Sequence, residues 1–73
     1  PPADLDHLAK AAACLDRGDE PAAVPHLAAH VQSRPDAVMI RACLAELLLK
    51  IGKPDEARRH FERYTRDAAG LTG

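Results

Sequence analysis

Two histidines in the segment "HLAAH" are the first residues whose types and spacing could do chemistry. His26 and His30 lie four residues apart, so a helix would place both on one side, where they could hold a metal ion. A metal site needs a third ligand, and none is evident nearby, so His60 or a carboxylate would have to converge from another segment. We therefore expect no metal and no cofactor, and we interpret His7 and His30 as partly buried structural residues.

Arginines near the carboxyl end are the second candidate, because guanidinium groups bind phosphates. They are Arg58, Arg59, Arg63 and Arg66. Acidic residues alternate with them, and three acid–arginine pairs have the four-residue spacing of ion pairs on a helix. These pairs are Asp55–Arg59, Arg58–Glu62 and Glu62–Arg66. Together with a net charge of −1, the alternation predicts a solvated helix face and no nucleic-acid partner.

The sequence contains no arrangement of residues that predicts an enzyme. It has no Ser/His/Asp or Cys/His motif and no glycine-rich phosphate loop. Cys14 and Cys43 lack the CxxC spacing of redox and metal motifs, so we interpret both as small buried apolar residues. A disulfide between them is the alternative. Free thiols favour a reducing compartment, and without a recognisable secretory signal we expect a cytoplasmic location.

Helix-breaking residues divide the chain into four segments that must position these side chains. They are Gly18, Pro21, Pro35, Gly52 and Pro54. Helices are expected over residues 4–17, 20–33 and 36–51 and from 54 on, with fraying from 68. Asp19 is expected to cap the second helix, and Pro25 to delay its start or to kink it. The opening helix of about 15 residues rises about 22 Å, less than the ~30 Å core of a bilayer, so no membrane partner is expected.

The segment "VMIRACLAELLLKIG", residues 38–52, is apolar on most sides of the expected helix. A helix that is apolar all round is a buried helix, so neighbouring helices are expected to cover it. The residues expected to pack against them are Leu44, Leu47, Leu48 and Ile51. Because the burial of one leucine contributes about 1.5–3 kcal/mol, this helix should hold the domain together.

An internal repeat emerges when the chain is compared with itself at an offset of 34 residues. The identical pairs are Ala11/Ala45, Leu15/Leu49, Gly18/Gly52, Ala23/Ala57 and His26/His60, and Leu27 meets Phe61. Small residues and glycines thus recur where helices must touch or turn. With these positions and the run "GKPDEARRHFERY", the chain resembles the tetratricopeptide repeat family, whose unit has about 34 residues.

This resemblance implies an all-α fold of two stacked antiparallel helix–turn–helix hairpins in a single domain. Repeat one would span residues 4–37 and repeat two residues 38–71. The third helix would lie between the two helices before it and the one after it, and His26 and His60 would lie on the convex outer side. Lys10 departs from the family pattern by replacing a leucine, and His30 and Tyr64 replace a small residue.

The resemblance also implies a non-catalytic module for protein–protein interaction. In the family, the first helix of each unit lines a concave groove, and here that face is mostly apolar, as in interaction surfaces. The groove residues are then Leu5, Leu8, Ala12, Leu15 and Asp16 from the first unit and Met39, Ala42, Glu46, Leu49 and Lys50 from the second. The expected occupant is an amphipathic helix or apolar peptide of a partner protein, or a second copy of the chain.

Family members that hold a peptide's terminal carboxylate use lysine, asparagine or arginine on this face. Here those places hold Leu8, Ala9, Ala12, Ala42, Cys43 and Glu46, so no such clamp for a chaperone tail is expected. Glu46 and Lys50 are spaced to form an ion pair on the rim. Two alternatives stay open: further repeats cover the groove face, or the chain is a regulatory or scaffold segment of a larger enzyme or transcription factor.

Overall fold

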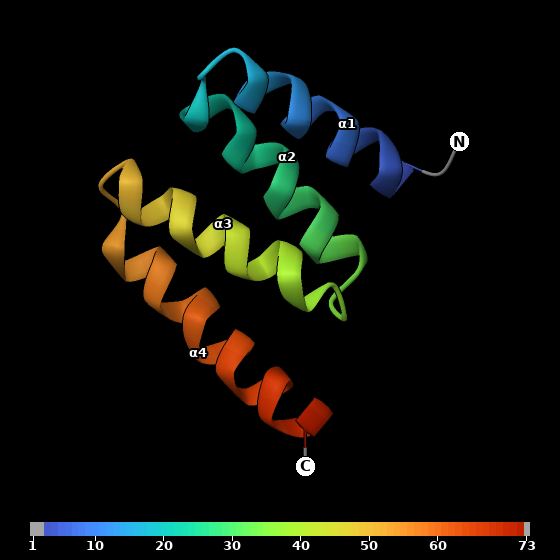
Figure 1. Ribbon diagram of the computed structural model, residues 1–73, viewed down its shortest axis with the longest axis vertical. Helices are drawn as coiled ribbons and strands as arrows, with labels where there is room; N and C mark the ends of the chain where they lie inside the picture. Colours follow the sequence, from blue (N-terminus) through green and yellow to red (C-terminus); the bar gives the residue numbers. More distant parts are fainter. Residues whose placement is uncertain (1–2, 73) are drawn as a thin grey trace.

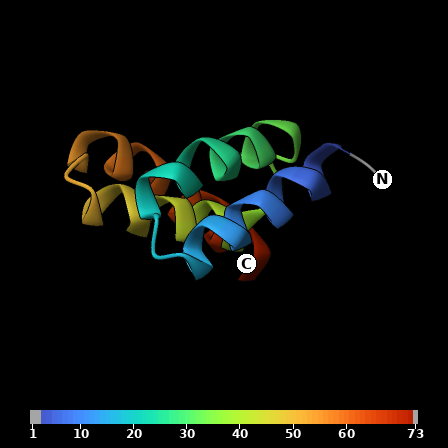
Figure 2. The same ribbon diagram turned by 90° about the horizontal axis from the view of Figure 1, so that it is seen from above.

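Four α-helices form the domain in the computed structural model, which describes the backbone of residues 3–72 and the side chains of residues 6–70. They follow one another in a row (Figure 1) as α1 (Ala3–Asp16), α2 (Glu20–Ser33), α3 (Val38–Lys50) and α4 (Pro54–Thr72). Residues 3–72 contain no strand, which confirms the all-α fold. Seen from above, α1 and α3 lie on one side of the row, and α2 and the start of α4 on the other (Figure 2).

Each hairpin turns at a glycine with a positive φ. Gly18 follows α1 with φ 75° and Gly52 follows α3 with φ 84°, a conformation that glycine adopts without steric cost. Asp19 then caps α2 as predicted, because its side chain accepts a hydrogen bond from the backbone N–H of Ala22 at 3.3 Å. Pro54 is the first residue of α4, where its missing N–H is not needed.

The core lies where the helices of each hairpin meet and where α2 meets α3. Small residues at equivalent repeat positions are almost fully buried and let the helices approach closely: Ala11 and Ala45, Ala23 and Ala57. Leu44 and Leu48 are the largest side chains with less than 2 % exposure. Leu27 and Val31 of α2 pack in the same cluster as these leucines, which confirms that α3 holds the two hairpins together.

The surroundings of α3 differ from the expectation in one respect. It packs against α2 and α4, but no Cα atom of α1 lies within 8 Å of α3 among the described residues. On α1, Lys10 stands at the position equivalent to Leu44 and forms an exposed ion pair with Asp6 at 3.0 Å. This side of α1 is therefore suited to solvent, and the predicted contact between the first and third helices is wrong.

Two predicted helix starts also need correction. The third helix begins at Val38 and not at residue 36, because the Ala37 N–H bonds to the Arg34 carbonyl at 3.0 Å in a turn. The second helix begins at Glu20, so Pro25 does not delay it. Pro25 cannot donate to the carbonyl of Pro21, and both residues are exposed, so water can reach that carbonyl.

Two further expectations are wrong. The helix α4 does not fray from Ala68 but continues to Thr72, and an ion pair one turn earlier, between Arg63 and Asp67 at 3.1 Å, supports this stretch. Cys14 is buried as predicted, but Cys43 is exposed, because its side of α3 faces neither α2 nor α4. Both thiols are free, so the alternative of a disulfide is not realised.

Candidate functional site

Exposed apolar side chains gather on α1 and α3. Among the described side chains, the large hydrophobic residues that are exposed are Leu15 at 41 %, Met39 at 68 % and Leu49 at 51 %. All three belong to the face predicted to line a groove. The other predicted residues are exposed or half-buried: Leu8, Ala12, Asp16, Ala42, Glu46 and Lys50. Leu5 lies outside the described side chains.

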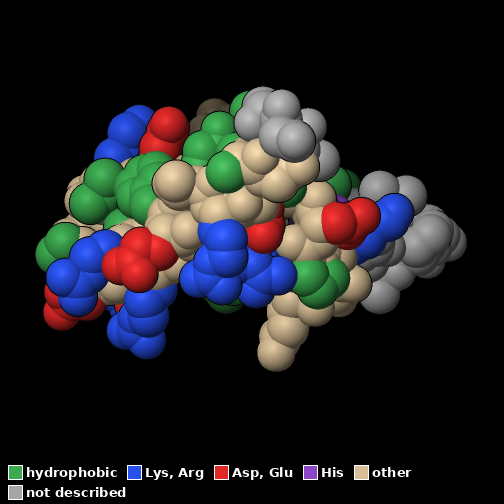
Figure 3. All heavy atoms as spheres, turned by 90° about the horizontal axis from the view of Figure 1, so that it is seen from below, with side chains coloured by type: hydrophobic (Ala, Val, Ile, Leu, Met, Phe, Trp, Pro, Cys, Tyr) green, Lys and Arg blue, Asp and Glu red, His purple; other side chains and the backbone are tan. Residues whose placement is uncertain are grey.

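The structure does not bring the two predicted halves of the groove into contact, because α1 and α3 stay apart. Leu49 instead lines a hollow of about 430 Å³ whose other residues come from α4: Pro54, Arg58, Phe61, Glu62 and Thr65. The molecule is turned with α4 toward the reader in Figure 3, where hydrophobic side chains gather among charged ones. Phe61 is half-buried, whereas its repeat equivalent Leu27 is buried, because α3 covers α2 and no described helix covers α4 in the same way.

Lys50 does not form the predicted ion pair with Glu46. Its Nζ atom lies 3.4 Å from the Glu20 carboxylate, so it joins the second hairpin to the start of α2. This leaves Glu46 as an exposed carboxylate on the α1–α3 side, next to the exposed apolar residues.

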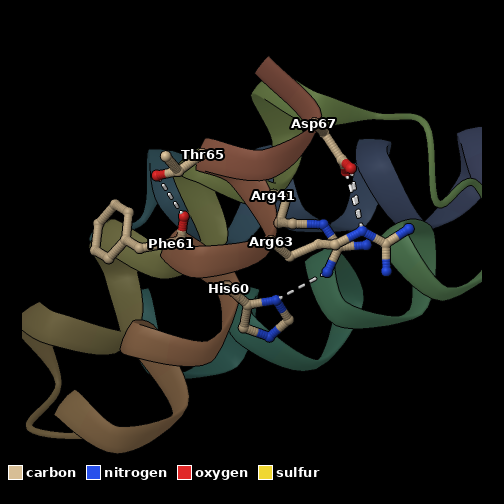
Figure 4. Close-up of polar contacts among 6 residues, drawn as sticks. All are labelled: Arg41, His60, Phe61, Arg63, Thr65 and Asp67. Carbon is tan, nitrogen blue, oxygen red and sulfur yellow. Dashed lines mark hydrogen bonds and ion pairs between the residues drawn. The ribbon is translucent and has the colours of Figure 1, made fainter. Parts of the chain in front are cut away.

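A group of basic side chains on α3 and α4 was not expected as a unit. We call it the basic cluster; it consists of Arg41, Arg59, His60, Arg63 and Arg66, which together with Glu56 line a hollow of about 540 Å³. Arg41 is 8 % exposed, and its Nη1 atom donates to Nδ1 of His60 at 3.2 Å (Figure 4). The α4 members recur every three or four residues, so they share one side of that helix.

The predicted ion pairs of α4 formed only in part. Arg58 and Glu62 lie 3.8 Å apart as predicted. Arg59 and Arg66, however, form no ion pair with the described residues, because exposed pairs of long side chains gain little free energy. The solvated face predicted for the arginines therefore describes Arg58, but not the cluster that forms around the buried Arg41.

The electrostatics of the cluster favour a neutral histidine. Burial lowers the pKa of His60 below its usual value, and the positive charges of Arg41 and Arg59 lower it further against the opposing effect of Glu56. Burial and the charge of Arg63 also lower the pKa of Arg41. Since Arg41 can only donate, Nδ1 of His60 must accept, and the ring proton lies on Nε2.

The same pair of positions is in contact in both hairpins. His7 and His26, which precede Arg41 and His60 by 34 residues, approach to 3.5 Å between their Nδ1 atoms. Thus His26 and His60 are half-buried and face the first helix of their own hairpin, and not freely outward. The offset that aligned His26 with His60 also aligns His7 with Arg41, and this was the signal that could have revealed the pairs.

The described residues contain no group of three or more His, Cys, Asp or Glu side chains placed to hold a metal ion. His30 is buried, as predicted for a structural residue. None of the described helices combines the length and apolar character needed to cross a membrane.

The family model described as tetratricopeptide repeat matches residues 7–29 and 38–63, which is more than half of the chain. The chain belongs to the tetratricopeptide repeat family. Neither the curated proteins nor the solved structures contain a match to it. The two matched segments are tandem repeats, and each consists of most of one hairpin, α1–α2 and α3–α4.

Tetratricopeptide repeats generally mediate protein–protein interaction, and the family is typically non-catalytic. In this repeat pair, the positions that turn the chain and the positions that let helices touch are the ones that the repeat comparison identified. The surfaces left for partners are then the exposed apolar side of α1 and α3, the hollow beside α4, and the basic cluster.

Proposed function

We propose that this tetratricopeptide repeat pair binds a partner polypeptide through the exposed side of α1 and α3. We call this side the apolar face; it consists of Leu8, Ala12, Leu15, Asp16, Met39, Ala42, Glu46, Leu49 and Lys50, with Leu5 as a further proposed member. The occupant is an amphipathic helix or apolar peptide of another protein, or a second copy of the chain, and the domain has no catalytic role of its own. We further propose that it acts in the cytoplasm.

One observation carries this proposal. All large hydrophobic side chains that are exposed in the described part of the chain lie on the apolar face. Exposed methionine and leucine on one side of a small domain are costly to leave in water, and a contiguous patch of this kind is typical of an interaction surface. Met39 suits such a surface further, because its flexible thioether adapts to different partner shapes.

The charged residues of the face would orient the occupant. Asp16 and Glu46 are exposed, so a helix with lysine or arginine beside its apolar stripe would complement them. Lys50 is held by Glu20 and leaves the acidic groups without a positive neighbour from this pair. The favoured ligand is therefore an amphipathic helix with a basic margin.

Calorimetric titration with such a peptide, together with sedimentation of the free protein over a wide concentration range, tests the proposal. We expect Met39→Glu to abolish peptide binding or self-association, because it places a carboxylate in the centre of the face. Ala13→Glu is the matched control: Ala13 is exposed on α1 but lies outside the face, so binding should persist. A protein that stays monomeric and ignores the peptide would refute the proposal, as would equal effects of the two substitutions.

A further inference from the structure

We propose that the basic cluster binds carboxylate groups of an acidic polypeptide segment. This site is separate from the apolar face, because Arg41 is buried on one side of α3 while Met39 and Glu46 are exposed on another. It also requires the opposite chemistry of its ligand, since the apolar face favours a basic margin.

The floor of the site is a buried guanidinium group without a carboxylate partner. Arg41 donates from Nη1 to a neutral ring nitrogen of His60, and its Nε atom is buried without any hydrogen-bond partner. Buried charged groups are ordinarily paired, and buried donors are ordinarily satisfied. Arg41 therefore holds both an uncompensated charge and an unused donor where α3 meets α4.

The walls of the site are the arginines of α4. Arg63 directs Nε at both carboxylate oxygens of Asp67, at 3.2 and 3.1 Å, which leaves its terminal nitrogens to other acceptors. Figure 4 shows its guanidinium group beside that of Arg41, so two like charges face one another across the site. Arg59 and Arg66 are exposed without ion pairs among the described residues and can close over a ligand.

The shape of the site admits a side chain. Arg41, His60 and Arg63 line two adjoining hollows, one of about 540 Å³ toward Glu56 and one of about 370 Å³ toward the end of α2. A carboxylate placed between the guanidinium groups would accept paired hydrogen bonds in the geometry that arginine favours. It would also relieve the repulsion between the two like charges.

The neighbouring charges favour a carboxylate over a phosphate, and a polypeptide over a nucleic acid. Glu56 and Asp67 border the cluster and would repel a doubly charged phosphate more than a singly charged carboxylate. Single-stranded nucleic acids are held largely by stacking on aromatic side chains. Phe61 and Tyr64, the two aromatic residues of the chain apart from its histidines, are half-buried and are not part of the cluster.

A nuclear magnetic resonance titration with a glutamate-rich peptide tests this inference, with the same peptide carrying glutamine as the comparison. The glutamate peptide should shift the side-chain Nε–H signals of Arg41 and Arg63, and added salt should weaken its binding. Arg66→Gln and Arg59→Gln should each raise the dissociation constant about five- to ten-fold, as for the loss of one charge-assisted hydrogen bond. Both side chains are exposed, so the fold should persist.

Arg58→Gln is the matched control, because Arg58 is an exposed arginine of α4 that lines the hollow with Leu49 and not the cluster. Its dissociation constant should stay within about two-fold of the unchanged protein. Equal binding of both peptides, an equal effect of Arg58→Gln, or no binding at all would overturn the inference. Signals that shift with inorganic phosphate or a single-stranded oligonucleotide, but not with the glutamate peptide, would overturn it too.

Discussion

The sharpest test of the packing compares two neighbouring leucines in α3. Leu48 is 1 % exposed in the core and Leu49 is 51 % exposed on the apolar face, so the same change to alanine acts in two environments. Removing a fully buried leucine side chain destabilises a protein by about 2–5 kcal/mol, because burial is lost and a cavity remains. A chain of 73 residues is expected to have only about 4–11 kcal/mol of stability.

We therefore expect Leu48→Ala to lower the free energy of unfolding by about 3 kcal/mol. With a urea dependence of about 1 kcal/mol per molar, the midpoint followed by far-ultraviolet circular dichroism should fall by about 3 M. Leu49→Ala should cost less than about 1 kcal/mol, because half of its side chain is already in water and helix propensity barely changes. Similar midpoints for the two variants would refute the assignment of core and surface on α3.

Three further predictions concern the turns and the basic cluster. Gly52→Ala should lower the free energy of unfolding by about 1 kcal/mol in urea titrations: a Cβ would meet no atom within 4 Å, so the cost is that of φ 84° in a residue with a side chain. Asp19→Ala should cost about 1 kcal/mol by the same measurement, because it removes the cap of α2, whereas Asp19→Asn should be nearly neutral. The urea midpoint should also fall as the pH drops through about 6.5, since the unfolded chain then takes up a proton that the neutral His60 of the folded chain does not. His60→Gln should flatten this dependence, and an unchanged slope would contradict the neutral ring.

The fold could be predicted because its determinants are local in the sequence. Glycines with positive φ, a proline that starts a helix and an aspartate that caps one act within a few residues, so their positions fix the hairpins. The offset of 34 residues then identified Ala11, Ala23, Ala45 and Ala57 as the places where helices touch. The residues of the apolar face followed from the same register, although their binding role remains a proposal.

The basic cluster could not be predicted because it depends on a contact between two helices. Along α4 alone, acids and arginines alternate, which indicates a solvated surface. Only the packing of α3 on α4 places the buried Arg41 beside His60 and so separates Arg58 from the other arginines. The separation of α1 from α3 was missed for a related reason, since the resemblance gave the pattern of neighbours but not their distances.

The most direct test of the central claim, that the exposed side of α1 and α3 binds a polypeptide, is a map of backbone amide shifts in the uniformly ¹⁵N-labelled protein. An amphipathic helical peptide with a basic margin should produce saturable changes that centre on Leu15, Met39 and Leu49 and leave the side of α2 that faces α4's basic residues unchanged. Changes confined to α2 and α4, or no saturable change together with a protein that stays monomeric at high concentration, would contradict the claim.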